Sequence, residues 1–191
     1  MKKLLTTALA VMVTLSLSAQ GTVEFKNLVA GGQKLQLQAT LGGALANLPT
    51  TGYQVALFWA PAGTTDPATF QPLGAAASPS AAGYVSAGAR TIDAPFAGGA
   101  NASFLVRGWE TAFGSSYAAV MASGNINAHA GESAIWTMKT GNPNASPPDT
   151  PPAIGSFGFP GLTVGVAIPE PSTIALGLLG LVGLFVLRRR S

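Results

Sequence analysis

Residues 53–60, Tyr53-Gln54-Val55-Ala56-Leu57-Phe58-Trp59-Ala60, are the stretch that decides the fold. In an extended chain Val55, Leu57 and Trp59 fall on one face, and Ala56 and Phe58 fall on the other. Both faces are mostly apolar, so both must be covered by other parts of the protein. The pattern therefore predicts a central strand of a β-sheet.

Further candidate strands lie on both sides of this segment. Residues 34–40 alternate strictly between apolar and polar side chains, which is typical of a half-buried strand. The other strand-like windows are residues 21–25, 83–92, 102–110, 133–140 and 162–167, separated by clusters of Gly, Pro, Asn and Asp. Only residues 115–122 favour a helix. About seven strands with little helix predict an all-β fold, an antiparallel β-sandwich ectodomain over residues 20–140.

The composition limits the chemistry. The chain has 191 residues, which is enough for one domain with a hydrophobic core. It contains no Cys, which excludes disulfides, thiolate zinc sites and cysteine nucleophiles, and its one His excludes a multi-histidine metal centre within one chain. The sequence indicates no metal and no cofactor.

The net charge of +3 comes from the two ends of the chain. Lys2, Lys3 and residues 188–190 supply five of the ten basic residues, and the body of the chain, residues 20–167, has five basic and six acidic residues and a net charge of −1. Nucleic-acid binding needs a basic face on the folded domain. We therefore expect no nucleic-acid partner.

The N-terminus has the pattern of a secretory signal peptide over residues 1–19. Lys2 and Lys3 precede a mostly apolar stretch that ends in small residues, so signal peptidase is expected to cleave after Ser18 or Ala19. An uncleaved anchor is the alternative, but the apolar stretch is shorter than the roughly 20 residues that a membrane span needs.

Prolines mark the segment after the predicted domain. Five of the twelve residues from 141 to 152 are Pro, which predicts a stiff, extended linker over residues 141–167. The candidate strand at residues 162–167 either pairs back onto the domain or belongs to this stalk.

The C-terminus combines Pro169-Glu170-Pro171, an apolar run over residues 174–187, and Arg188, Arg189 and Arg190. The prolines hold the chain extended. The apolar run rises about 21 Å as a helix, against a hydrocarbon core of about 30 Å. Starting the helix at Ser172 and snorkelling of the arginines closes most of this gap. The pattern predicts a short transmembrane helix with its arginines in the cytoplasm.

These three parts, in this order, resemble the PEP-CTERM protein-sorting signal of bacteria over residues 168–191. The resemblance implies that an exosortase, a membrane protease, recognises the motif and removes the hydrophobic tail. The product would then reach the cell surface or the extracellular polysaccharide matrix. Pro169, Glu170 and Pro171 match the motif residue for residue. The alternative is a simple membrane anchor without processing, which would need the helix and the arginines but not Pro-Glu-Pro.

No catalytic residue is indicated. His129 lies in a loop-like stretch without a Gly-x-Ser-x-Gly elbow, so a solvated loop histidine is expected. The scattered carboxylates are expected to be exposed or paired with cations. These patterns predict a non-enzymatic protein, and an exported hydrolase has no supporting motif.

One pair of residues is a candidate glycan contact. Trp109 and Arg107 share a strand face, and an exposed Arg107 would place Trp109 on the surface as well. The other aromatic residues are expected in the core. The alternative function is therefore a carbohydrate-binding module that uses exposed aromatics.

Overall fold

The computed structural model describes residues 20–167. The predicted signal peptide (residues 1–19) and the predicted sorting signal (residues 168–191) lie outside the described residues. The elements are β1 Gly21–Lys26, β2 Leu35–Gln38, β3 Leu45–Asn47, β4 Tyr53–Pro61, η1 Pro67–Thr69, β5 Gln71–Pro72, β6 Ser86–Ile92, β7 Asn101–Glu110, α2 Tyr117–Ser123, β8 His129–Glu132, β9 Trp136–Lys139, η2 Ile154–Ser156 and β10 Leu162–Val166. Within residues 20–167, no helix is both long and apolar enough to cross a membrane.

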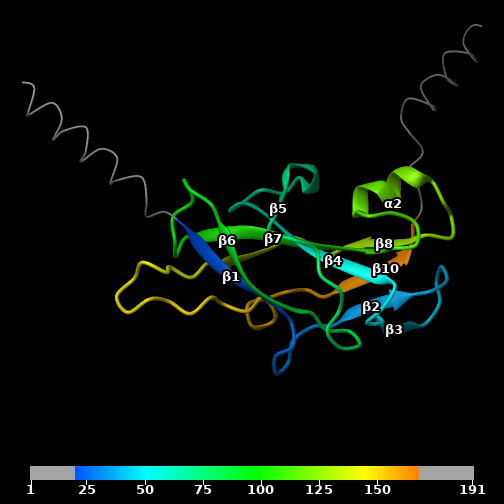
Figure 1. Cartoon of the computed structure of the whole chain (residues 1–191), viewed down its shortest axis with the longest axis horizontal. Coiled ribbons are helices and arrows are strands. Elements are labelled where there is room, and N and C mark those ends of the chain that lie inside the picture. The colour runs from blue at the N-terminus through cyan, green and yellow to red at the C-terminus, as the bar shows by residue number, and fades with distance from the viewer. Residues whose placement is uncertain (1–19, 168–191) are drawn as a thin grey trace, which may run out of the picture.

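The strands form two sheets of unequal size (Figure 1). β1 and β6 make a two-stranded antiparallel sheet, and the large sheet has the order β3-β2-β10-β8-β7-β4-β5, with β9 also beside β7. Both sheets contribute to one core, as Val23 and Phe25 of β1 and Phe104 and Val106 of β7 show. The predicted all-β class is confirmed. The prediction of purely antiparallel pairing is wrong at β10, which runs parallel to β2.

β4 and β7 form the centre of the large sheet. They pair without interruption from Tyr53 opposite Glu110 to Pro61 opposite Ala102. Val55 and Leu57 belong to the core shared by the two sheets, whereas Ala56 packs in a separate cluster on the outer face of the large sheet. The central strand predicted over residues 53–60 is therefore confirmed.

Helix α2 covers part of that outer face. Ser116 caps it, because the Ala119 N–H donates to Ser116 Oγ at 3.1 Å, and Gly124 ends it with a φ of 64°. Val120 is fully buried beneath the helix. The helix predicted over residues 115–122 is confirmed with a shift of two residues at its start.

Residues 141–167 belong to the folded domain, so the linker interpretation is wrong for them. Ile154 is fully buried in the shared core, Phe159 is 3% exposed, and β10 lies between β2 and β8. The prolines do hold the chain extended, but an extended chain can also lie along a sheet. The glycine at position 131 lets β10 approach, because a side chain there would collide with the Thr163 carbonyl.

Candidate functional site

The residues predicted from sequence to have a function fall into two groups. Pro169, Glu170, Pro171 and the three arginines at 188–190 lie outside the described residues. Arg107 and Trp109 lie on β7, on the outer face of the large sheet.

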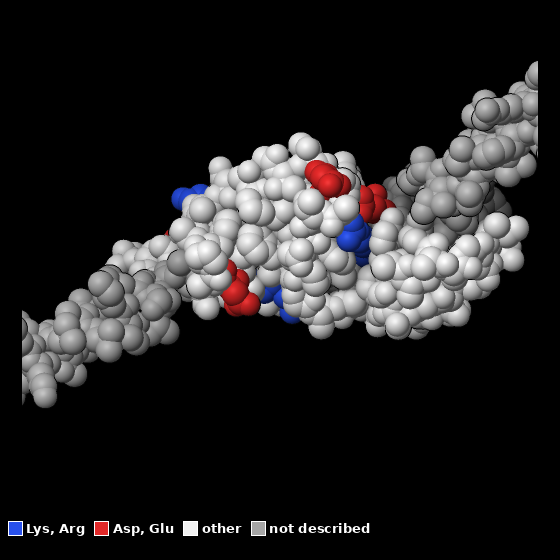
Figure 2. All heavy atoms as spheres, turned by 90° about the horizontal axis from the view of Figure 1, so that it is seen from above, with Lys and Arg blue, Asp and Glu red and all other residues white. Residues whose placement is uncertain are grey.

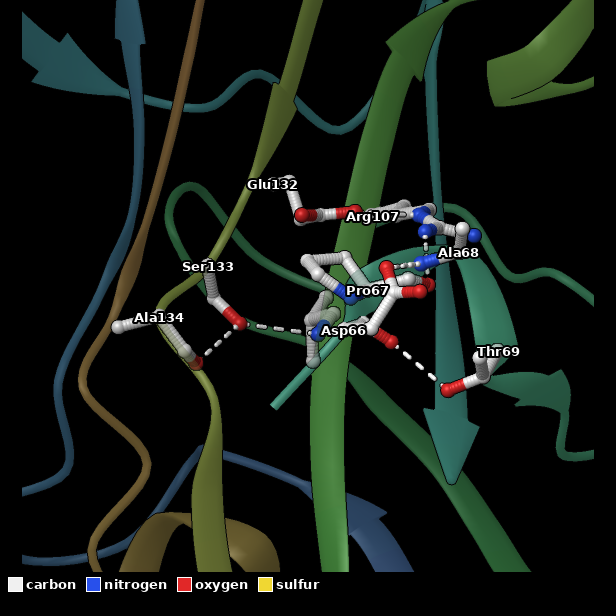
Figure 3. A network of polar contacts seen from close by, with 9 residues as sticks. Asp66, Pro67, Ala68, Thr69, Arg107, Glu132, Ser133 and Ala134 are labelled. Carbon is white, nitrogen blue, oxygen red and sulfur yellow. Dashed lines mark hydrogen bonds and ion pairs between the residues drawn. The ribbon is translucent and has the colours of Figure 1, made fainter. Parts of the chain in front are cut away.

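Arg107 contacts residues of four other elements, and Figure 3 shows its contacts with Glu132 and Pro67. Its Nε is 2.6 Å from Oε2 of Glu132, directly opposite on β8, and its Nη2 donates to the Pro67 carbonyl of η1 at 2.8 Å. Its guanidinium also lies 4.5 Å from the Phe58 ring centroid and 5.2 Å from that of Tyr117 on α2. The side chain is 15% exposed, so the prediction of an exposed arginine is wrong. These contacts hold β8, η1 and α2 against β7, so Arg107 has a structural role.

Neighbouring hydrogen bonds hold the surrounding loops against the sheet (Figure 3). Asp66 caps η1, with its Oδ1 accepting from the Ala68 N–H at 3.0 Å. On the other side of β7, Ser133 Oγ accepts from the Val106 N–H at 2.9 Å and donates to the Ala134 carbonyl at 3.0 Å. Each of these polar groups therefore has a hydrogen-bond partner within the protein.

Trp109 is buried, which corrects the prediction of a surface-displayed tryptophan. Its side chain does share a strand face with Arg107, but α2 covers that face, and Trp109 is only 3% exposed. The other buried residues of its cluster are small, and larger, partly buried residues pack against them. The buried ones are Val120, Ala56, Ala128, Ala130 and Ala167, and the larger ones are Phe58, Phe113, Tyr117 and Met121. Strand alternation indicates which side chains share a face, but not which distant segment covers it.

Arg107 and Trp109 nevertheless line one cavity of about 370 Å³, beneath the start of α2. Phe58 and Tyr117 are the other aromatic residues in its wall. The Arg107 guanidinium already contacts both of these rings. Stacking on a sugar needs a free ring face, so this geometry does not favour the glycan contact.

His129 lies on β8 and is half-buried, which corrects the prediction of a solvated loop histidine. Its Nδ1 is 2.7 Å from Glu110 Oε2, and its Nε2 is 3.1 Å from the Ala39 carbonyl in the loop after β2. Both partners accept hydrogen bonds, so the doubly protonated imidazolium satisfies both contacts. Burial by itself lowers the pKa of His129, but the hydrogen bonds to Glu110 and Ala39 and the Glu110 charge together raise it above 6.5.

This arrangement predicts a pH-dependent stability. A raised pKa means that the folded state holds the proton more tightly than the unfolded chain does. The stabilisation is therefore complete below about pH 6.5 and is lost as the pH rises through the folded-state pKa. We expect the free energy of unfolding to fall by about 1 kcal/mol over this window, measured by urea titration. His129→Asn should remove the dependence, because the chain has one His. An unchanged slope in this variant would contradict the assignment.

His129 and most acidic side chains of the described residues have partners within the protein. The two ring nitrogens of His129 contact Glu110 and the Ala39 carbonyl rather than a serine hydroxyl. Within residues 20–167, no three His, Cys, Asp or Glu side chains are grouped to hold a metal ion. The carboxylates of Glu24, Asp66, Glu110, Glu132 and Asp149 all have polar or charged partners.

The end of β10 shows how the C-terminal segment leaves the domain. Val166 pairs with His129, and the Ala167 N–H donates to the Ala128 carbonyl at 2.7 Å. Ala167 is 5% exposed, beneath α2 beside Trp109. The chain is thus held in the sheet until two residues before Pro169. The proline-rich residues 141–152 indicated a linker, and the sequence therefore did not predict that this segment pairs with the sheet. The apolar alternation of residues 162–166 did correctly indicate a strand.

An all-β domain thus leads directly into a C-terminal targeting segment. Residues 167–190 match the family model of the PEP-CTERM protein-sorting motif, so the predicted resemblance is confirmed. The motif supports an exported protein that is sorted by an exosortase in the membrane. No curated protein and no solved structure matches the chain.

Proposed function

We propose that this chain is a non-enzymatic exported protein that an exosortase releases from the inner membrane to the cell surface or the extracellular polysaccharide matrix. Signal peptidase would remove residues 1–19, and the arginines at 188–190 would face the cytoplasm. The observation that carries the proposal is the match of residues 167–190 to the sorting motif.

The domain supports this role by presenting the motif close to a rigid sheet. Ala167 is buried in the domain, so only the six residues 168–173 connect the domain to the apolar run. Six extended residues span at most about 20 Å. Pro-Glu-Pro would therefore be offered close to the membrane, where the active site of a membrane protease can reach it.

Intact-mass spectrometry of the protein from its native host tests the proposal. The released product should lack Arg188–Arg190 and the apolar run, and a strain without exosortase should accumulate the form that retains them. The precursor and the released product differ by at least the mass of the apolar run and the three arginines, so mass spectrometry resolves them easily. If every native copy retained the three arginines, the protein would be a simple membrane anchor and sorting would be rejected.

A further inference from the structure

Two loops surround the point where the described chain ends. We call the loop residues 39–44 and 124–128, together with Ala167, the exit end. The Ala39 carbonyl contacts His129, and the Ala128 carbonyl accepts the hydrogen bond from Ala167. In Figure 1 both loops and the tip of β10 lie together at the right-hand end of the molecule.

Each loop of the exit end exposes one large apolar side chain. Leu41 is 75% exposed and Ile126 is 71% exposed, the highest values among the large hydrophobic residues of the described chain. Isolated exposed hydrophobic residues are common on soluble proteins. Exposure alone is therefore no argument, and the surroundings of these two residues decide what they can contact.

The surroundings contain very little charge. No Lys, Arg, Asp or Glu occurs in residues 35–65 or in residues 111–131. Glu110, which directly precedes the second of these ranges, is paired with His129. Figure 2 shows no charged side chain on the visible face of the right-hand end. A surface without charged side chains avoids the largest cost of entering an apolar environment, which is the desolvation of ionised groups.

The length of the chain beyond Ala167 limits what the exit end can face. Residues 168–173 span at most about 20 Å before the apolar run begins. If that run is in the bilayer, as the proposed function requires, the exit end is held within about 20 Å of the lipid surface. An apolar surface sits about 5–10 Å deep at the boundary between headgroups and acyl chains.

We propose that Leu41 and Ile126 insert into the bilayer surface while the uncleaved precursor is anchored, so that the domain docks on the membrane through its exit end. Together with the strand that ends at Ala167, these two contacts give the domain one orientation. The Pro-Glu-Pro segment is then held at the lipid boundary. This inference rests on the proposed function, because it needs an anchored precursor.

Single cysteines can test the docking, because the natural chain has none. Leu41→Cys, Ile126→Cys and Phe157→Cys each take an environment-sensitive NBD label. Phe157 is a matched control, because it is 52% exposed but lies at the opposite end of the domain. It lines a pocket with Lys139, and Lys139 pairs with Asn101, the first residue of β7, whereas Glu110 is the last residue of β7. The ten residues of β7 place its two ends about 30 Å apart.

The full-length precursor, purified without exosortase, is reconstituted into vesicles of phosphatidylethanolamine and phosphatidylglycerol that carry nitroxide-labelled lipid. Labels at 41 and 126 should shift their emission to shorter wavelength and be quenched at least about twofold more than the label at 157. Equal quenching at all three positions, in precursor that stays with the vesicles through an alkaline wash, would overturn the docking alone. Precursor that washes off would overturn both the docking and the proposed anchoring.

Discussion

Trp109→Ala is expected to lower the free energy of unfolding by about 3–5 kcal/mol, the usual cost of removing a buried aromatic side chain. The indole is 3% exposed and is the largest buried side chain of its cluster, so its removal would leave a large cavity there. A natural domain has a total stability of about 5–15 kcal/mol, so this one change would remove a large part of it.

Urea unfolding followed by circular dichroism measures this effect without relying on tryptophan fluorescence. Trp109→Phe is the matched variant. It keeps most of the ring and removes an indole N–H that has no hydrogen-bond partner among the described residues, so it should cost much less than alanine. A loss below about 1 kcal/mol for Trp109→Ala would mean that the indole is displayed at the surface, as the sequence predicted.

The same result bears on the glycan alternative. Loss of glycan binding in Trp109→Ala would not by itself identify a sugar contact, because the domain would also be destabilised. Trp109→Phe keeps the core filled. Loss of binding in that variant, with stability retained, would therefore revive a carbohydrate-binding role.

Glu170→Ala is expected to abolish removal of the C-terminal tail in the native host and to leave the precursor in the membrane fraction. Its carboxylate is the only charge in Pro169-Glu170-Pro171, and we expect it to pair with a cation of the exosortase. Removing one partner of a buried charge pair costs about 2–5 kcal/mol, which weakens recognition about thirtyfold or more.

Intact mass and membrane fractionation measure this outcome together. Asp93→Ala is a suitable control, because Asp93 is an exposed acid of the domain that lies outside the motif. It should be processed like the natural chain. Normal tail removal from Glu170→Ala would show that the exosortase does not depend on this carboxylate.

Strands with strong alternation were predictable, and those without it were not. Residues 34–40, 53–60 and 102–110 correspond to β2, β4 and β7. The missed strands are β3, β5 and β8, which have two to four residues each and little apolar alternation. Their pairing comes from neighbouring strands far away in the sequence. β8 is the clearest case, because it lies between β7 and β10 and thereby turns His129 from an expected loop residue into a paired one.

The sequence by itself determined the all-β class, the central strand, the short helix and the C-terminal sorting motif, because each of these is encoded in adjacent residues. Only the tertiary structure decided that Trp109 and Arg107 are covered by α2 and η1, and that the chain after the proline-rich residues 141–152 returns to the domain as β10. Both outcomes depend on contacts between residues far apart in the chain, where burial of apolar area outweighs local preference. Tertiary packing also places Leu41 and Ile126, 85 residues apart, beside the point from which the sorting motif leaves the domain.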